Sequence, residues 1–398
     1  MSNQYLVEPC LDFVEQVASL GGDSVKKCYQ CATCTVACTI APDNSPFPRK
    51  EMIATSWGLK DRVLGSADIW MCHECGDCSE LCPRGAQPAD VLSAARSAAI
   101  TEYATPKFLG KMVNDAKMLP LFLGIPAAWF ALMAFITMTM GESMEKLFKG
   151  FGMHWHHHTD APIASADFVS SWLVDVTFVP LLNLSILIFL IGLIKFVKDI
   201  HANAVLEGKT DKTDFNLVQY LVSVVKAIPT IMLHKKFNEC GENKSRALAH
   251  QMVLFGFIGC FIVTAIFFVV LYIGGVAGPY DQINPVKILA NIAGVGIVVG
   301  SFLMIKDRLA KSEPSSFKDW ALLVLVFGLG ATGMLTQGVR LLGYIDGLVG
   351  IAQVVSYFFY YIHLILIFCL FAYLPFSKMA HIVYRVAALG YAEYANRK

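Results

Sequence analysis

The sequence predicts an all-α protein in which a cysteine-rich N-terminal domain precedes a bundle of six transmembrane helices. Three observations lead to this prediction. Mean hydropathy is positive, and only 16% of the 398 residues are charged, which is low for a soluble protein. Eight of the 12 cysteines form two runs of equal spacing, and long apolar segments recur from Leu119 onward.

The cysteine runs carry the strongest chemical signal. Each reads C-x2-C-x2-C-x3-C: Cys28, Cys31, Cys34 and Cys38, then Cys72, Cys75, Cys78 and Cys82. This spacing wraps a 4Fe-4S cluster, and in two-cluster ferredoxins the fourth cysteine of a run ligates the other cluster. We therefore expect two 4Fe-4S clusters, one on Cys28, Cys31, Cys34 and Cys82 and the other on Cys72, Cys75, Cys78 and Cys38.

Zinc is the alternative, since tetrathiolate zinc sites also use C-x2-C pairs. Each run, however, supplies more cysteines than a zinc ribbon uses. A disulfide framework fits poorly because the chain shows no secretory signal. The thiols suit a reducing cytoplasm.

Residues 1–110 are expected to form the cysteine-rich domain, since they contain no segment long enough to span a bilayer. Between the cysteine runs, Arg49 to Trp57 and Lys60 to Gly65 read as short helices, and alternating β-branched residues are scarce. An α-helical ferredoxin is therefore predicted.

Residues 111–398 are expected to form the membrane domain. Apolar runs of about 20 residues can cross a bilayer core, and there they must be helical. The predicted spans are 119–140, 172–196, 250–273, 285–305, 319–343 and 351–376.

Lysine and arginine set the predicted orientation. The connections 197–249, 306–318 and 377–398 are rich in both, whereas the opposite loops carry Lys146 and Lys149, with Arg340 near a helix end. The positive-inside rule then places both termini and the cysteine-rich domain in the cytoplasm. We expect the membrane to be the cytoplasmic membrane of a prokaryote. If Asp214 to Leu233 were a seventh span, the later loops would change sides and the charge rule would be violated. We therefore interpret this segment as an amphipathic helix on the inner surface or as an ordinary packing helix.

Histidines in the spans suggest a second cofactor, because ligating side chains inside a bilayer are costly. His363 lies in the sixth span, and His381 follows five helical turns later, so a continuous helix would present both on one face. His250 opens the third span at the depth of His381, and the two could ligate one haem b. The alternatives are an interfacial His250 and a His363 hydrogen-bonded within the bundle.

The second ligand of a haem on His363 is open. Candidates are Cys260 and a loop cluster that comprises His154, His156, His157 and His158, which could equally be exposed. His73, inside the second cysteine run, is expected to shield or tune its cluster.

The paired runs resemble the small iron–sulfur subunit of heterodisulfide reductases. The tail resembles the cytochrome b subunit of respiratory nitrate reductase, through Ile362-His363-Leu364, Leu374-Pro375-Phe376-Ser377-Lys378 and His381-Ile382. A chain that joins the two looks like the membrane subunit of quinone-interacting membrane-bound oxidoreductase complexes of sulfate reducers. By this resemblance His250 and His381 hold the haem nearer the cytoplasm, and His363 holds a second haem, with Cys260 where that family has a histidine.

The resemblance implies electron exchange between menaquinone and flavin-containing partner subunits of the heterodisulfide-reductase type, and through them with adenylylsulfate reductase. Another complex of this type, for instance one serving sulfite reduction, is the alternative. A membrane redox sensor and a transporter are two further alternative functions. Residues that could assist quinone chemistry are Asp175, Asp346, Arg340 and Tyr344. A net charge of +1 and the absence of basic stretches with interleaved aromatic residues argue against nucleic-acid binding.

Overall fold

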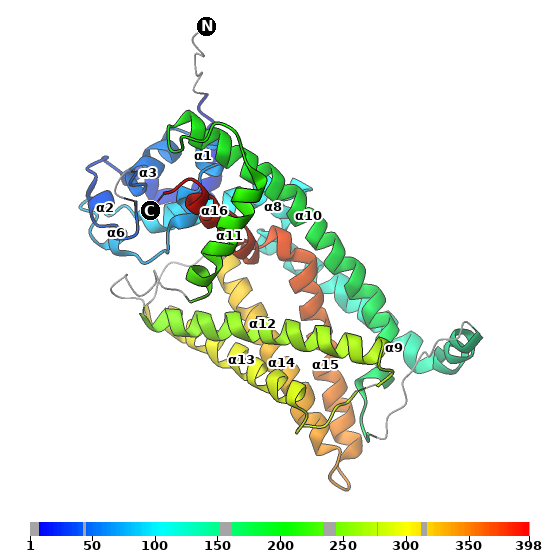
Figure 1. The fold of residues 1–398 in the computed structure, drawn as a ribbon. Helices are drawn as coiled ribbons and strands as arrows, with labels where there is room; N and C mark the ends of the chain where they lie inside the picture. The colour runs from blue at the N-terminus through cyan, green and yellow to red at the C-terminus, as the bar shows by residue number, and fades with distance from the viewer. Residues whose placement is uncertain are drawn as a thin grey trace.

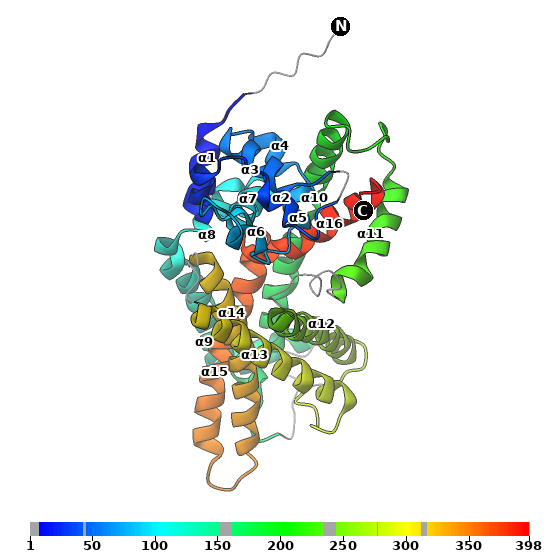
Figure 2. The ribbon, with the colours of Figure 1, turned by 90° about the vertical axis from the view of Figure 1, so that its left-hand side faces the viewer.

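The computed structural model describes residues 8–42, 45–150, 161–233, 244–276, 278–311 and 317–397. Within these ranges every regular element is helical, which confirms the predicted all-α class. The chain has two parts (Figures 1 and 2): a head of short helices, and long helices that extend away from it.

The described part of the head holds eight α-helices, besides a π-helix (Ala18–Gly22) and a 3-10 helix (Asp23–Lys27). The α-helices are α1 (Leu11–Val17), α2 (Thr33–Val36), α3 (Pro48–Ser56), α4 (Lys60–Leu64), α5 (Asp68–Met71), α6 (Asp77–Glu80), α7 (Pro88–Tyr103) and α8 (Lys107–Val113). Helices α3 and α4 are the two short helices expected between the cysteine runs. Helix α7 is largely buried and alanine-rich, so the other head helices can pack closely around it.

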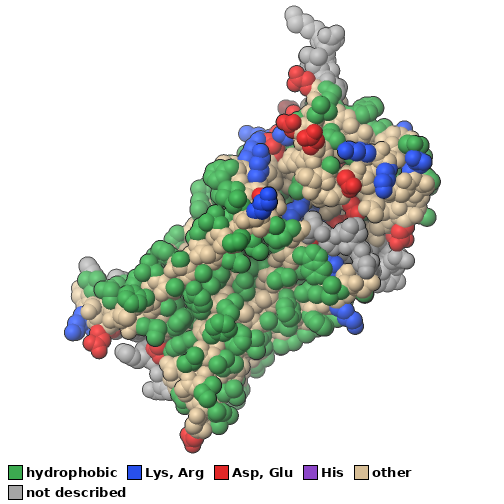
Figure 3. All heavy atoms as spheres, turned by 180° about the vertical axis from the view of Figure 1, so that it is seen from behind, with side chains coloured by type: hydrophobic (Ala, Val, Ile, Leu, Met, Phe, Trp, Pro, Cys, Tyr) green, Lys and Arg blue, Asp and Glu red, His purple; other side chains and the backbone are tan. Residues whose placement is uncertain are grey.

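Six helices of the described chain are long and apolar enough to cross a membrane. They are α9 (Leu119–Gly150), α10 (Ser171–Leu206), α12 (Lys244–Tyr272), α13 (Pro285–Lys311), α14 (Phe317–Leu342) and α15 (Val349–Tyr373). Each overlaps one predicted span. Hydrophobic side chains cover the sides of these helices, whereas charged ones gather over the head and at the far tips (Figure 3). This distribution suits a multi-pass membrane protein.

Helix α11 (Leu217–Met232) is apolar but too short for a span. One face packs on α16 (His381–Tyr394), where Tyr220 donates a hydrogen bond to the carbonyl of Ala387 (3.1 Å). The other face is open: Val218 is 71% and Val225 65% exposed. This agrees with the prediction that residues 214–233 form a helix that does not span the membrane.

The prediction of one continuous helix through His363 and His381 is wrong. Helix α15 ends at Tyr373, and two short 3-10 turns separated by an extended Ser377 lead into α16. Pro375 has no N–H to donate and its ring blocks the preceding turn, while the Ser377 hydroxyl accepts from the N–H of Met379 (3.3 Å). The two histidines therefore stand on different helices.

Head and long helices share one hydrophobic core. Trp70 of α5 stacks on Tyr384 of α16 (ring centroids 5.7 Å apart) and meets the ring of Phe196 of α10 edge-on (5.8 Å). Tyr103 donates to Asp199 of α10 (3.0 Å). Since α5 leads directly into Cys72, this packing fixes the second cysteine run against the end of the bundle.

A buried ionic cluster reinforces the junction. Asp68, fully buried at the start of α5, pairs with Lys209 (2.8 Å) and with Arg397. Burial alone would raise the pKa of Asp68, but the charges of Lys209 and Arg397 outweigh it and lower the pKa. Removing one partner from such a cluster leaves a buried charge uncompensated, which typically costs about 3–5 kcal/mol.

Candidate functional site

The two cysteine runs share one backbone conformation. In each run, the second residue after the first cysteine has a positive φ: 62° at Gln30 and 56° at Glu74. The fourth residue after that cysteine also has a positive φ: 70° at Ala32 and 94° at Gly76. Helices α2 and α6 begin at the next residue. The left-handed region costs a non-glycine residue about 1–2 kcal/mol, so its use at matching positions indicates a requirement common to both loops.

One group of cysteines lines a small cavity in the head. It comprises Cys28, Cys31 and Cys34 of the first run together with Cys82 of the second, and Arg49 and Arg84 also line it. Burial, with contributions from the neighbouring Cys28 and Cys31, raises the pKa of Cys34 to about 11. These four are the cysteines that the sequence places on one cluster.

Cys38 lies with the second run. Burial raises the pKa of the Cys38 thiol, and the nearby Cys72 and Cys75 add to this rise. Burial likewise raises the pKa of Cys78, with contributions from Cys72, Cys75, Cys34 and Cys38. Thiols crowded in this way favour a cationic centre that binds them as thiolates.

In the described chain no three His, Cys, Asp or Glu side chains converge closely enough for a single metal ion. A cubane spreads its ligands over four irons, so its thiolates stand farther apart than the ligands of one ion. The two cysteine groups are compatible with that wider arrangement.

Arg96 of α7 fixes the start of the second run. Its guanidinium donates to the carbonyls of Ile69 (3.1 Å) and Cys72 (3.0 Å) and pairs with Glu74 (2.5 Å). The sequence analysis did not single out Arg96. The available signal was a single arginine in the middle of an alanine-rich helix, where a buried charge requires partners.

A cavity of about 2310 Å³ extends through the long helices. Its wall includes all three candidate histidines, His250, His363 and His381, and at the head it reaches Trp70 and His73, beside Cys72. At the opposite end it reaches Asp175 of α10. One continuous space therefore connects the second cysteine run to the far end of the bundle.

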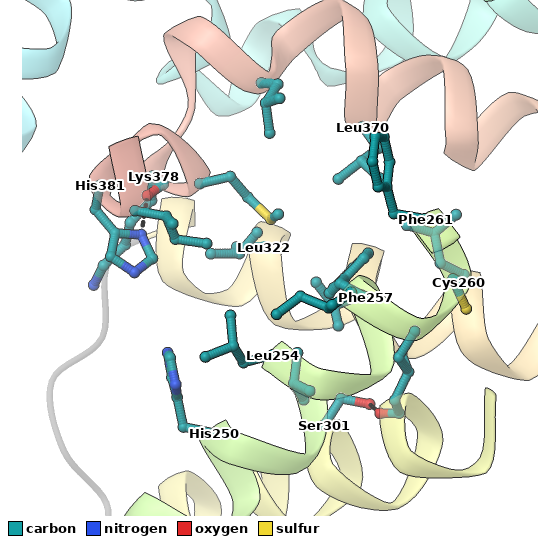
Figure 4. A pocket seen from close by; sticks show the side chains of 18 of the residues that line it. His250, Leu254, Phe257, Cys260, Phe261, Ser301, Leu322, Leu370, Lys378 and His381 are labelled. Carbon is teal, nitrogen blue, oxygen red and sulfur yellow. Dashed lines mark hydrogen bonds between the residues drawn. The ribbon is translucent and has the colours of Figure 1, made fainter. Parts of the chain in front are cut away.

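His250 and His381 face each other across the inner part of this cavity (Figure 4). They come from α12 and α16, and Leu254 and Leu322 lie beside the space between them. Burial, with a contribution from His250, lowers the pKa of His381 to about 3 despite its hydrogen bond to the Lys378 carbonyl. His381 is therefore neutral at physiological pH.

The hydrogen bonds indicate which ring nitrogen is available in two of the histidines. Nδ1 of His381 lies 2.6 Å from the carbonyl oxygen of Lys378, which can only accept. Nδ1 of His363 lies 3.0 Å from the hydroxyl of Thr332, whose own proton goes to the carbonyl of Gly328 (2.7 Å). In both rings Nδ1 therefore carries the proton, and Nε2 keeps the lone pair that an axial iron ligand needs.

Arg385 lies near both His381 and the head. It lies one helical turn after His381 and lines the same cavity. Burial lowers its pKa to about 10, and Arg96 contributes to this, whereas Cys72 and Glu74 oppose it. A charged guanidinium therefore lies within electrostatic range of both Cys72 and His381.

The remaining candidates fall in three places. His154, His156, His157 and His158 lie outside the described residues. Cys260 lines the cavity. Tyr344 and Asp346 are exposed in the turn after α14, and Arg340 is buried but is not among the cavity-lining residues.

Comparisons with known proteins identify the head. A family described as the 4Fe-4S dicluster domain matches residues 24–86. A subunit of the H(2):CoB-CoM heterodisulfide,ferredoxin reductase of Methanothermobacter marburgensis is 37% identical over 89 residues, 22% of this chain and 48% of that protein. The iron–sulfur subunit of the CoB–CoM heterodisulfide reductase of Methanopyrus kandleri is 36% identical over 118 residues, 30% of this chain and 55% of that protein.

The chain carries an iron–sulfur domain homologous to the iron–sulfur subunit of heterodisulfide reductases. It spans about half the length of these relatives. They are redox subunits of oxidoreductase complexes, which supports a general role in electron transfer.

A third relative also covers the long helices. Citrate utilization protein B of Escherichia coli is 23% identical over 362 residues, 82% of each chain. The similarity thus extends beyond the iron–sulfur domain into the apolar part of the molecule.

Proposed function

We propose that this chain is the membrane electron-transfer subunit of a quinone oxidoreductase complex, which passes electrons between menaquinol and soluble flavin and iron–sulfur partners. The observation that carries the proposal is the cavity that joins His363, the His250–His381 pair and the wall beside Cys72. A path of this kind links an apolar substrate in the membrane to a redox domain at its surface.

Two haem b groups are proposed in this cavity. His250 and His381 would hold the inner one, and His363 would provide one ligand of the outer one. Such a haem supplies reversible one-electron transfer when bound. The residues fit it in chemistry, since His363 and His381 each present an unprotonated Nε2 and hold Nδ1–H on an acceptor. The neutral state of His381 is the one that binds metal.

In the head, the two groups of four cysteines would hold the two 4Fe-4S clusters. The domain of residues 1–110, the membrane domain of residues 111–398 and the cytoplasmic location of the head are part of the proposal. Arg96 holds the peptide at Cys72, and Trp70 packs between that peptide and α16. These residues keep the second run at a fixed position beside the cavity.

The proposed partners are flavin-containing subunits of the heterodisulfide-reductase type, with adenylylsulfate reductase as the final acceptor in sulfate respiration. The heterodisulfide reductase relatives support assembly with partner subunits, because each is itself one subunit of a reductase complex. The resemblance of the whole chain to the membrane subunit of quinone-interacting membrane-bound oxidoreductase complexes supports the second.

Citrate utilization protein B favours a second candidate function, an electron-transfer role in citrate use. This relative matches the long helices as well as the head. The two candidates share the iron–sulfur head and the membrane location, and they differ in the soluble partner.

An optical and iron analysis of the purified protein tests the proposal. We expect a reduced-minus-oxidised spectrum of haem b and about eight irons per chain beyond the haem, with the haem bands altered in His250→Ala, His381→Ala and His363→Ala. His201→Ala is the matched control, because His201 bonds Tyr391 (2.9 Å) and the Thr213 carbonyl (3.2 Å) away from the cavity. A protein without haem would refute the quinone-linked proposal and favour a redox sensor.

A further inference from the structure

We propose that Asp175, whose carboxyl group Tyr272 holds in place, forms the head-group site for the quinol at the end of the cavity far from the head. The inference rests on the proposed function and adds to it the site and its proton acceptor. The ligand would be a hydroquinone with an apolar tail.

The two residues join α10 to α12. The Tyr272 hydroxyl donates a hydrogen bond to Oδ2 of Asp175, and the ring of Trp172 meets that of Tyr272 edge-on at 5.8 Å. Asp175 lies near the start of α10, whereas the contacts of α10 with the head come from its second half, for example from Phe196, Asp199 and Asn203. The pair therefore lies at the end of the bundle opposite the head.

Asp175 is singled out by the distribution of acids in the cavity wall. The described acidic residues that line the cavity are Glu74, Asp175, Asp307, Asp319 and Glu393. All except Asp175 come from the head or from helix ends near it, and Asp319, for example, pairs with Lys378 (2.5 Å). A carboxyl in a membrane span is costly to bury, so the isolated acid at the far end requires a reason.

The surroundings of Asp175 suit an aromatic ligand. Phe178, Phe268 and Tyr360 line the cavity together with aliphatic side chains such as Val174 and Val269. Val179 and Val269 also line it while 43% and 51% of their surfaces remain accessible. An isoprenoid tail could therefore lie along an apolar passage between α10 and α12 while the ring packs on aromatic side chains.

Other candidates from the sequence do not meet these conditions. Tyr344 is 61% exposed, Asp346 lies in the same exposed turn, and neither lines the cavity. Arg340 is 6% exposed and is also absent from the wall. Of the four residues that could assist quinone chemistry, Asp175 is the one that shares a space with His363.

The proposed step is proton acceptance. A quinol hydroxyl donates to the Asp175 carboxylate, its O–H bond breaks, and a new O–H bond forms on the carboxyl group. For each quinol oxidised to quinone, two electrons pass singly to the b-type haem of the proposed function as oxidant, and two protons are released. Asp175 takes the first proton while Tyr272 holds the carboxyl group in place, and the second proton leaves to water.

The test uses the purified full-length protein and two probes. One is menadiol, whose ability to reduce the bound haem is followed optically. The other is 2-heptyl-4-hydroxyquinoline N-oxide, a quinol analogue whose binding is followed by fluorescence quenching. Variants are Asp175→Asn and Tyr272→Phe, with Asp346→Asn as the matched control in an exposed turn.

We expect Asp175→Asn to lower the menadiol-driven rate at least 10-fold and to weaken analogue binding, with an unchanged dithionite-reduced spectrum. Tyr272→Phe should lower the rate less than Asp175→Asn does, because Tyr272 orients the carboxyl group and does not take the proton, and it should shift the pH profile of the rate. Asp346→Asn should behave as the unaltered protein.

Two outcomes would overturn the inference: an unaltered protein that does not bind the analogue, or Asp175→Asn with normal rate and binding. Failure of the proposed function is recognised separately, because the unaltered protein would then show no haem spectrum. In that case analogue binding to the Asp175→Asn and Asp346→Asn variants still decides the inference.

Discussion

Gly333 of α14 lies directly against the imidazole of His363 on α15. A Cβ at position 333 would stand 3.0 Å from Cε1 of the ring, a separation that real Cβ atoms rarely show. Next to it, Thr332 holds Nδ1 of the same ring. Two consecutive residues of one helix therefore fix both the position and the tautomer of a histidine on its neighbour.

Gly333→Ala is expected to displace the His363 ring and to lower the haem content at that site about 10-fold, the lower range for losing support of a metal ligand. Gly338→Ala is the matched control: it lies on the same helix and an added Cβ meets nothing within 4 Å. Both changes favour the helix by about 1 kcal/mol. Haem quantification and the low-spin haem signal in electron paramagnetic resonance (EPR) provide the measurement, and equal haem content in the two variants would contradict the prediction.

Replacing the last cysteine of either run by serine should disturb the cluster that is held mainly by the other run. Cys82→Ser is expected to disturb the cluster on Cys28, Cys31 and Cys34, because Cys82 lines their cavity, and Cys38→Ser the one on Cys72 and Cys75. EPR spectra of the reduced protein, with iron counts, distinguish the two losses. Cys10→Ser should leave both signals intact. If each variant instead disturbed the cluster of its own run, the four cysteines of each run would ligate one cluster, and the prediction would be contradicted.

Arg385→Gln should make two centres harder to reduce. Removing a positive charge near Cys72 and His381 disfavours the added electron at each, so both midpoint potentials should fall. A redox titration followed optically for the haem and by EPR for the cluster measures this. Lys198→Gln, which changes an exposed lysine of α10, should move neither potential. If only stability changed, Arg385 would be a packing residue.

Glu51→Gln is expected to stabilise the protein at high pH. Burial raises the pKa of Glu51 to about 8, and Asp68 contributes to the rise, while Arg62 and Lys209 oppose it. In an unfolded chain this pKa is about 4.3. Between these values the folded state holds a proton that the unfolded state has lost, so stability falls as pH rises, by up to about 1.4 kcal/mol per pH unit.

Thermal denaturation at pH 5, 7 and 9 checks this. Glu51→Gln should match the unaltered protein at pH 5 and exceed it at pH 9, whereas Glu15→Gln, at an exposed position of α1, should follow the unaltered protein throughout. If the thermal stability of the unaltered protein and of both variants depended on pH in the same way, Glu51 would not hold a proton in the folded state, and the prediction would be contradicted.

The fold class and six apolar helices could be predicted because they depend on local signals: cysteine spacing and apolar length. The break between α15 and α16 was missed because Pro375 alone permits a kinked helix, and the extended Ser377 that redirects the chain has no periodic signature. Arg96, Arg385 and Trp70 were missed for another reason. Their importance comes from residues distant in the sequence that only the folded chain brings near: Cys72 for Arg96 and Arg385, and Tyr384 for Trp70.

The ion pair between Asp68 and Arg397 has a consequence for biosynthesis. The cysteine-rich domain leaves the ribosome long before Arg397 is synthesised, and domains generally fold in the order of synthesis. Until all the long helices have been inserted and α16 has returned, Asp68 lacks one of its cations and Trp70 lacks the ring of Tyr384. The packing of the cysteine-rich domain is thus completed by residues that are synthesised after all six long helices.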